Sequence, residues 1–438
     1  MLKTPLKHTL STGLIRLIGI PFSLMPYSWI HKIAKSFGSL AFFLGKPYRK
    51  CVMNNLAIAK DLQLKESEMQ KIAKESFHNL AITTLEYFRL HRSKNNLEEI
   101  IISKNPNILT ETAKHGKGLV IISSHQANWE IPMLDITRYL KGIAIGRPIK
   151  NHKLYTWILR LREMHGGKVI TPKKALSTGI KELKKGHFVG MACDQALTES
   201  SYSYPFFGVR AWTTSSPALL AYKTGAPLIA VTTERINNKY HIHYSPPIWP
   251  DTTKPLREEV CRLMDHSLAI FETSIKKFPG QYFWQHKRWK QSSINHVLKK
   301  YRKDFILIIL PNKEKLLEKI LSSLPTLKTI YPRSFFSFMV PEKKKDLPLP
   351  FKNSEIHTYA NLQDILVRDW RYQLVFDFID KRSIRRHFYK LSATHVLTER
   401  SLHTLASPYS TDNKDRDLSQ AMTLALTKKS SLEMSTNS

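Results

Sequence analysis

The chain has 438 residues, with 68 Lys and Arg against 35 Asp and Glu, a formal net charge of +33 and 42% hydrophobic residues. This composition excludes a disordered basic tail and predicts a chain that buries a core, and the length predicts two or three domains. All 16 glycines lie at or before Gly280, so a glycine-rich phosphate-binding loop is excluded from the rest of the chain. Residues 1–280 carry 40 basic and 20 acidic side chains and the remainder carries 28 and 15, so both parts are basic and suited to anionic surfaces.

The N-terminal segment, residues 1–50, is predicted to be helical and membrane-associated. It is apolar from Gly13 to Ile30, but Arg16, Pro21 and Pro26 interrupt it, whereas a spanning helix needs about twenty consecutive apolar residues. Lys and Arg alternate with apolar residues over positions 31–50, which favours a segment lying in the membrane interface. A buried helical hairpin is the alternative. A cleaved signal peptide is not expected, because no small-residue cleavage site follows a simple apolar segment.

Residues 51–292 are predicted to form an α/β domain. Apolar residues keep helical spacing over residues 54–91, and from Gly118 short β-rich runs alternate with helical segments. This alternation predicts a central mixed sheet flanked by helices. Functional side chains in such folds gather at the carboxyl ends of the strands.

The same alternation returns after a basic linker. Residues 304–405 are predicted to form a second, small Rossmann-like α/β domain, and the polar residues 406–438 are predicted to be disordered. The function of this additional domain does not follow from the sequence.

Three cysteines, Cys51, Cys193 and Cys261, are widely spaced. They form neither a disulfide framework nor a Cys-x-x-Cys metal pair, so a reducing compartment and no bound metal are expected.

The strongest chemical signal is the pair His125 and Glu130. His125 ends the predicted strand GLVIISS, and Glu130 follows after four residues in His-Gln-Ala-Asn-Trp-Glu. On a regular helix the two side chains would diverge by about 140°, so they can meet only if His125 lies in a loop and Glu130 in the first helical turn. In that arrangement the carboxylate of Glu130 would fix the imidazole tautomer, and the other ring nitrogen would act as a general base. The spacing alone is weak evidence, because the chain has 18 histidines.

Several motifs together resemble one family. GLVIISSHQANWE resembles the active-site motif, with its His-x4-Asp/Glu pair, of the late acyltransferases of lipid A biosynthesis in Gram-negative bacteria. Five further segments resemble segments of that family: RKCVMNNLAIA, GRPIKNHKL, ELKKGHFVGMACDQ, YPFFGVRAWTTSSPALLAYKTGAPLIAV and FPGQYFWQHKRWK. The resemblance covers roughly residues 10–292 and departs from the family pattern in the interrupted N-terminal segment and in the C-terminal extension.

The resemblance implies a glycerolipid-acyltransferase-like fold and an activity. A fatty acyl group would pass from an acyl-carrier-protein thioester to a hydroxyl of a lipid A precursor at the inner membrane, with the active site facing the cytoplasm. His125 would be the general base and Glu130 its orienting group; no cofactor beyond the acyl-carrier protein is expected. Cys193 is the rival covalent nucleophile, but its apolar neighbours favour a buried structural residue.

Further polar residues in the matching segments are expected at the site. Those expected to bind substrate or the oxyanion are Arg147, Asn151, Asp194, Gln195 and Arg235. Those expected to support the site are Trp284, His286 and Arg288. Three of these residues have a purely structural alternative: a surface salt bridge for Arg147, a helix cap for Asp194 and a packing role for Trp284.

Two other functions remain open. A glycerophospholipid acyltransferase also uses a His-x4-acid motif, but that family resembles Asn-His-x4-Asp, whereas Ser124 precedes His125 here and the acid is Glu130. A basic protein that binds membranes or nucleic acid fits the charge, but no nucleic-acid-binding motif accompanies it, and nucleic acid is not expected as a partner. The expected partners are acyl-carrier protein, the lipid A precursor glycolipid and an anionic membrane surface. The C-terminal extension faintly resembles one Rossmann-like half of lipopolysaccharide glycosyltransferases, and a docking role is favoured for it.

Overall fold

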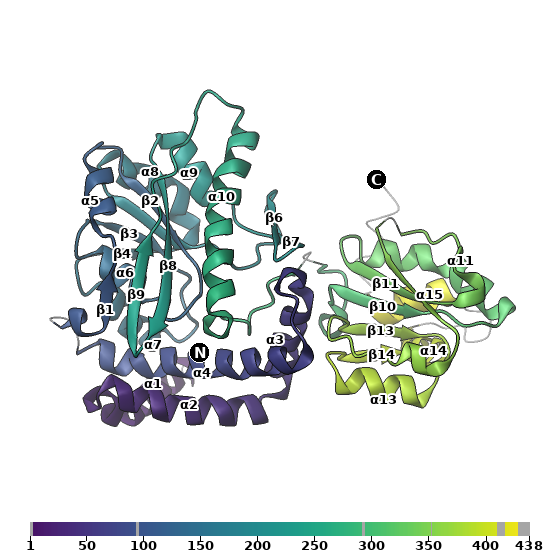
Figure 1. The fold of residues 1–438 in the computed structure, drawn as a ribbon. Coiled ribbons are helices and arrows are strands. Elements are labelled where there is room, and N and C mark those ends of the chain that lie inside the picture. The colour runs from purple at the N-terminus through teal and green to yellow at the C-terminus, as the bar shows by residue number, and fades with distance from the viewer. Residues whose placement is uncertain (1–2, 93–95, 291–293, 352, 410–416, 428–438) are drawn as a thin grey trace. The chain divides into compact units, whose positions relative to one another are not determined.

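The computed structural model describes residues 3–92, 96–290, 294–351, 353–409 and 417–427 (Figure 1). The chain divides into two compact units, each described here by itself. The first comprises Met1–Arg49 and Ala59–Arg288, and the second comprises Lys50–Ile58 and Trp289–Ser438.

The first unit begins with helices that lie along one end of its sheet (Figure 1). These are α1 (Lys3–Leu24), α2 (Tyr27–Leu44) and α4 (Glu66–Leu90). Pro26 separates α1 from α2 because a residue with its extended backbone, φ −59° and ψ 148°, cannot continue a helix. Among the described residues, no helix has the length and apolar content needed to cross a bilayer.

A seven-stranded mixed sheet forms the centre of the first unit in the described part of the chain, in the order β1-β9-β8-β2-β5-β3-β4. Its strands are β1 (Ile101–Ser103), β2 (Leu119–Ser123), β3 (Gly142–Ile145), β4 (Lys168–Ile170), β5 (Phe188–Ala192), β8 (Leu228–Ile236) and β9 (Lys239–Tyr244). Neighbouring strands are parallel except β8 and β9, which are antiparallel. The predicted central mixed sheet flanked by helices is confirmed.

Helices cover both faces of this sheet. On one face, Leu119 and Ile121 of β2 pack with α5 (Asn107–Ala113), α6 (Ile131–Ile136) and α7 (His152–Arg162). The other face is covered by α8 (Ala175–Lys184), α9 (Ser216–Thr224) and α10 (Leu256–Lys277). Both faces of the strand are therefore buried, which explains why β2 is a continuous apolar run rather than an alternating one. A hairpin of β6 (Ser203–Phe206) and β7 (Val209–Trp212) completes the unit.

The second unit holds a parallel sheet of five strands among the described residues, in the order β12-β11-β10-β13-β14. The strands are β10 (Phe305–Ile309), β11 (Phe335–Pro341), β12 (Glu355–Tyr359), β13 (Leu374–Asp377) and β14 (His395–Leu397). Its helices are α11 (Glu314–Ile330), α12 (Leu362–Ile365), α13 (Arg382–Lys390), α14 (Glu399–Ala406) and α15 (Leu418–Leu426). Two apolar clusters, one on each face, form its core.

Two segments of the second unit differ from expectation. Most of α3 (Lys46–Ile58) belongs to this unit, where Asn54 donates hydrogen bonds to the carbonyls of Trp370 (3.1 Å) and Arg371 (2.6 Å).

The predicted disorder of residues 406–438 is wrong for Leu418–Leu426, because the apolar residues of α15 are buried in the core and Asp417 caps its first turn. Residues 410–416 and 428–438 lie outside the described residues.

Short 3-10 turns lie at Lys60–Leu62, Leu97–Glu99, Pro172–Lys174, Pro279–Gln281, Lys299–Tyr301, Glu342–Lys344 and Ser407–Tyr409.

The contact between α2 and α4 depends on Gly38, where a Cβ atom would lie 2.7 Å from the His78 Cα and 2.8 Å from the Phe77 carbonyl oxygen. We expect Gly38→Ala to lower the free energy of unfolding by about 1–3 kcal/mol, because the backbone of α4 cannot yield without separating the helices. Gly13→Ala in α1 is the matched control, since its Cβ would meet nothing within 4 Å. Chemical denaturation measures both; equal effects of the two substitutions would contradict the close packing.

Candidate active site

The two central parallel strands bring His125 and Asp194 together. In the pairing of β2 with β5, Ser123 lies opposite Ala192, so the residues two positions further on meet beyond the carboxyl ends of the strands. Asp194 accepts two hydrogen bonds from His125, one from Nδ1 (2.6 Å) and one from the backbone N–H (2.8 Å). Burial alone would raise the pKa of the Asp194 carboxyl, but the His125 ring and backbone N–H outweigh it and lower the pKa to about 2.

This hydrogen bond determines what the imidazole can do. An ionised carboxylate only accepts hydrogen bonds, so Nδ1 of His125 carries the proton and, in the neutral ring, Nε2 keeps its lone pair. Nε2 lies 3.2 Å from the Gln195 amide nitrogen, and His125 lines a cavity of about 410 Å³. The rings of Trp129 and Phe283 flank the imidazole at 5.6 and 6.3 Å. His125 therefore presents a basic nitrogen in an aromatic-walled pocket.

Glu130 does not orient His125, and that prediction is wrong. Its carboxylate is held by Arg162, through Nε (2.7 Å) and Nη2 (2.6 Å), and it accepts a further bond from the Tyr87 hydroxyl. Burial would raise the pKa of Glu130, but the Arg162 guanidinium and these hydrogen bonds lower it. The cause is the backbone between the two residues: Ala127 adopts φ 50°, and the turn it makes sends Glu130 toward α7 and α4 while His125 faces Asp194. Both side chains still line the same cavity.

Side chains of helix α4 make hydrogen bonds to the loop of residues 126–130 and fix its position. Asn79 and Thr83 each donate to the carbonyl of Ala127, at 3.0 Å. One turn further on, Glu86 accepts from Asn128 (2.8 Å), and Tyr87 donates to Glu130. The left-handed conformation of Ala127 costs free energy that these buried bonds offset.

Glu86 also joins the loop to α2. It is fully buried and lies 2.6 Å from Nε2 of His31, and it accepts a hydrogen bond from Tyr240 (2.5 Å). Burial would raise the pKa of Glu86, but His31, Arg235 and Tyr240 lower it. The loop is thereby fixed to the sheet and to two helices.

The cavity beneath His125 is mostly apolar. Its wall is built from the apolar residues Ile121, Pro132, Met133, Ile136, Ala144, Ile145, Val169, Phe188 and Met191. At its rim lies the exposed Arg147, and among the ion pairs of the described residues none involves this guanidinium. The pocket thus combines a base, a free cation and an apolar interior.

Two residues expected at the site lie elsewhere. Asn151 caps α7 by accepting from the backbone N–H of Leu154 (3.1 Å), and it bonds Ser11 and Thr12 of α1. Arg235 lies at the end of β8, where its backbone pairs with the Gln281 side chain, and it lines a second cavity. Neither residue lines the pocket of His125, so neither is placed to bind a group that reacts there.

The closing segment carries the three residues expected to support the site, and each of them makes a hydrogen bond within the first unit. Arg288 is buried, donates to the Trp212 carbonyl (3.1 Å) and to Thr213 (2.7 Å), and lies over the Phe206 ring. Nε2 of His286 accepts from the backbone N–H of Ala196 (3.0 Å), and burial lowers the pKa of His286 to about 4, so the ring is neutral. The indole of Trp284 is buried and donates to the Pro279 carbonyl (2.8 Å).

Cys193 is a poor nucleophile in this setting. Its side chain is buried, and burial together with the adjacent Asp194 raises the pKa of its thiol well above the ordinary value. Among the described residues, no group of three or more His, Cys, Asp or Glu side chains could hold a metal ion.

The sequence did not predict the roles of three sets of residues at the site. Asp194 was expected to bind substrate or the oxyanion, or to cap a helix, rather than to hold His125. Arg162 was not distinguished from the other cations of a basic helix. The polar residues Asn79, Thr83, Glu86 and Tyr87 carried a signal, because they recur at helical spacing on a face of α4 that is otherwise apolar.

The chain is similar to known proteins of one family. Residues 3–291 match the model of a family described as bacterial lipid A biosynthesis acyltransferase. The chain is 26% identical over 186 residues to the lipid A biosynthesis palmitoleoyltransferase of Escherichia coli K12 and, to the same extent, to a lipid A biosynthesis acyltransferase of Shigella flexneri. These alignments cover 42% of the chain and 59% of each relative, so the chain spans less than two thirds of the relatives' length.

A basic nitrogen held by a buried carboxylate at the end of a mixed sheet, above an apolar cavity, is an arrangement suited to acyl transfer. The chain belongs to the bacterial lipid A biosynthesis acyltransferase family. The family resemblance inferred from the motifs is confirmed.

The depressed pKa of Asp194 makes stability depend on pH. The folded-state pKa, about 2, lies below the ordinary value of 3.8, so its contribution is present above about pH 4 and is lost as the pH falls toward 2. A shift of this size corresponds to about 2 kcal/mol. In urea unfolding, the stability difference between the wild type and Asp194→Asn should therefore shrink by that amount between ~pH 5 and ~pH 2. A difference that stays constant over this range would contradict the ionised pair.

Proposed function

We propose that the protein transfers a fatty acyl group from an acyl-carrier-protein thioester to a hydroxyl of a lipid A precursor. The observation that carries this proposal is the His125–Asp194 pair, in which His125 lines a cavity with an apolar wall and Asp194 leaves Nε2 free to act as the base. The family to which the chain belongs supplies the class of acceptor. An apolar cavity accommodates an acyl chain, and a base at its mouth can activate a hydroxyl.

In the proposed reaction, Nε2 of His125 removes the proton of the acceptor hydroxyl. The oxygen attacks the carbonyl carbon of the thioester, a carbon–oxygen bond forms, and the carbon–sulfur bond breaks. The imidazolium then returns its proton to the leaving thiolate, which gives an ester and a free carrier thiol. Asp194 stabilises the imidazolium while it exists, as the buried carboxylate of a hydrolase triad does.

Three further residues have proposed roles. Arg147, at the rim, stabilises the negative oxygen of the tetrahedral intermediate. Gln195 contacts Nε2 in the absence of substrate and yields this position to the hydroxyl. Glu130 with Arg162 is a positioning pair that holds the wall of the cavity rather than a partner of the base.

We expect His125→Ala and Asp194→Asn each to lower kcat by about 10²–10⁴-fold, because each removes general-base catalysis. Cys193→Ala is the matched control: it changes the neighbour of Asp194 and should keep activity, since no acyl-enzyme forms. The measurement is transfer of a labelled acyl group from acyl-carrier protein to a lipid A precursor, with glycerol 3-phosphate as a second acceptor. Retained activity in His125→Ala, loss in Cys193→Ala, or transfer only to glycerol 3-phosphate would each contradict the proposal.

The exposed apolar residues support a membrane location. Of 21 exposed large apolar side chains in the described part of the chain, twelve lie between Leu10 and Tyr48. Exposing so much apolar surface to water is unfavourable, and lysines lie between these residues. We propose that α1 and α2 lie in the interface of the inner membrane, with the active site facing the cytoplasm, where a lipid acceptor is within reach.

This placement predicts a binding defect. Leu40→Glu with Phe43→Glu should abolish most flotation of the protein with vesicles that contain phosphatidylglycerol, because both exposed side chains would carry charge into the acyl boundary. Ile356→Glu with Val367→Glu alters two exposed apolar residues in the second unit and should leave flotation unchanged. Equal flotation of the two variants would argue against membrane contact through α2.

A further inference from the structure

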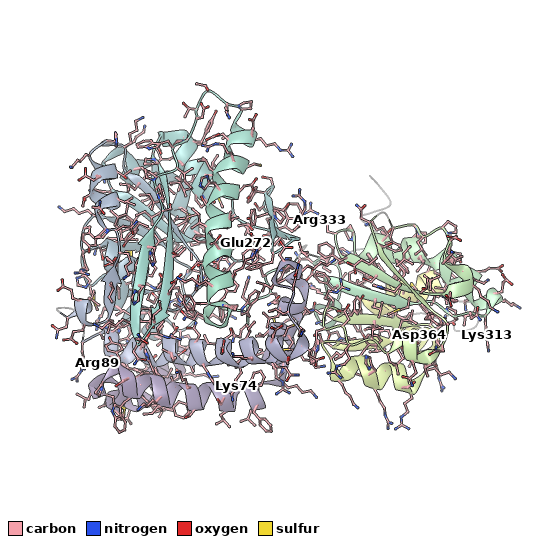
Figure 2. All side chains as sticks on the ribbon, viewed as in Figure 1. Lys74, Arg89, Glu272, Lys313, Arg333 and Asp364 are labelled. Atoms are coloured by element: carbon pink, nitrogen blue, oxygen red, sulfur yellow. The ribbon has the colours of Figure 1, made fainter. Side chains whose placement is uncertain are left out.

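A second cavity, of about 820 Å³, lies outside the His125 pocket and has no part in the chemistry above. We call it the basic cavity. Its cationic and ionisable basic side chains come from four elements: His31 and Lys35 of α2, Lys71, Lys74 and His78 of α4, Arg235 of β8, and Lys277 of α10. Segments far apart in the sequence therefore converge their basic groups on one hollow. Lys74 is labelled on α4 in Figure 2.

The positive charge of the basic cavity is largely uncompensated. Glu75 is the one acidic residue among its lining residues in the described part of the chain, and Lys277 pairs with Glu234 (3.0 Å). Within the same described residues, no ion pair involves Lys35, Lys71 or Lys74. Cations crowded together without partners repel each other and favour an anion between them.

His78 lies among these cations. Its ring lies in the cavity wall, 2.8 Å from the hydroxyl of Ser39. Burial lowers the pKa of His78, and the ammonium groups of Lys74 and Lys35 lower it further. Lys35 of α2 and Lys74 of α4 therefore both lower the pKa of the same imidazole ring.

The shape and surroundings of the cavity favour a phosphate on a lipid. A phosphate monoester offers three acceptor oxygens and up to two negative charges, which match several ammonium donors around a hollow. Helix α2 presents Lys35 to the cavity and also carries the exposed apolar residues Phe37, Leu40 and Phe43. A ligand with a phosphate and apolar chains meets both surfaces.

One backbone hydrogen bond links the lining of the basic cavity to the loop that carries His125. Gln281 lines the basic cavity, and its carbonyl accepts the backbone N–H of Ala127 (2.8 Å), two residues from His125. Phe283, two residues after Gln281, flanks the imidazole. An anion bound in the basic cavity would therefore lie beside a segment that is hydrogen-bonded to the His125 loop.

We infer that the basic cavity binds the phosphate of a phosphorylated lipid, separately from the pocket in which the acyl group reacts. The lipid is either the glycolipid acceptor, in which case the inference rests on the proposed function, or a phospholipid of the membrane. With either lipid, the group that binds is a phosphate, and the residues that hold it are Lys35, Lys71, Lys74 and Arg235.

The direct test is titration of the full chain with inorganic phosphate, followed by ³¹P NMR. Lys71→Gln with Lys74→Gln should weaken phosphate binding about tenfold or more, because two charge-assisted contacts are lost. Lys181→Gln with Lys184→Gln is the matched control: it removes two exposed lysines at the same spacing from α8, outside the cavity, and should bind as the wild type does. Equal affinity of the three proteins, or no binding by the wild type, would overturn the inference.

Two further measurements identify the source of the phosphate. If it belongs to the acceptor, the Lys71/Lys74 variant should show a raised KM for the phosphorylated acceptor, with kcat and the KM for a dephosphorylated acceptor unchanged. If it belongs to a phospholipid, the variant should lose flotation with phosphatidylcholine vesicles that contain phosphatidic acid, while the KM stays the same. A raised KM for acyl-carrier protein alone would overturn the inference and assign the cavity to an acidic protein.

These outcomes are separable from a failure of the proposed function. If the wild type acylates no glycolipid, the phosphate titration and the flotation assay still report on the cavity. If acylation proceeds but phosphate does not bind, the proposed function stands and the phosphate site does not.

Discussion

The buried contact between His125 and Asp194 is the interaction around which the site is built. A carboxylate with no exposure to solvent is stable in its charged form only when hydrogen-bond donors surround it, and here two of the donors are the ring and the backbone N–H of one histidine. The contact therefore fixes the ring orientation and the backbone at once. It exists because β2 and β5 are parallel neighbours and end together, so the geometry of the sheet places the base.

The rest of the first unit keeps that histidine loop in place. The loop makes a left-handed turn at Ala127, and α4 supplies the donors and acceptors that such a turn needs. Through Glu86 and His31, the same helix ties the loop to α2, which carries much of the exposed apolar surface. The segments proposed to meet the membrane and the segment that carries the base thus belong to one hydrogen-bonded assembly.

The sequence predicted the sheet strands well where each was a short apolar run that ended in a polar residue. It located His125 and Asp194 separately for this reason, since both follow such runs. It paired His125 with Glu130 because the two are close in sequence, whereas the true partner lies 69 positions away, across a strand pairing that no local pattern specifies. Arg162 was missed for a similar reason. Nothing in the local sequence distinguishes it from the other basic residues of its helix, and only the fold places it next to the buried carboxylate of Glu130.

The excess positive charge can be divided in physical terms. Part of it is structural, because Arg162 and Arg288 are held by buried partners. Part is unpaired and gathered in the basic cavity. In the second unit, exposed Lys and Arg side chains on α13 contribute to a charge whose role the fold alone does not assign.

The tautomer of His125 tests the central claim most directly. With ¹⁵N-labelled histidine, NMR of the wild type should show that the neutral form of the ring carries its proton on Nδ1, with the lone pair at Nε2. Asp194→Asn should lose this single tautomer, and Glu130→Gln should keep it, because the Glu130 carboxylate bonds Arg162 and Tyr87 instead. The reverse result, with the tautomer lost in Glu130→Gln and kept in Asp194→Asn, would contradict the account.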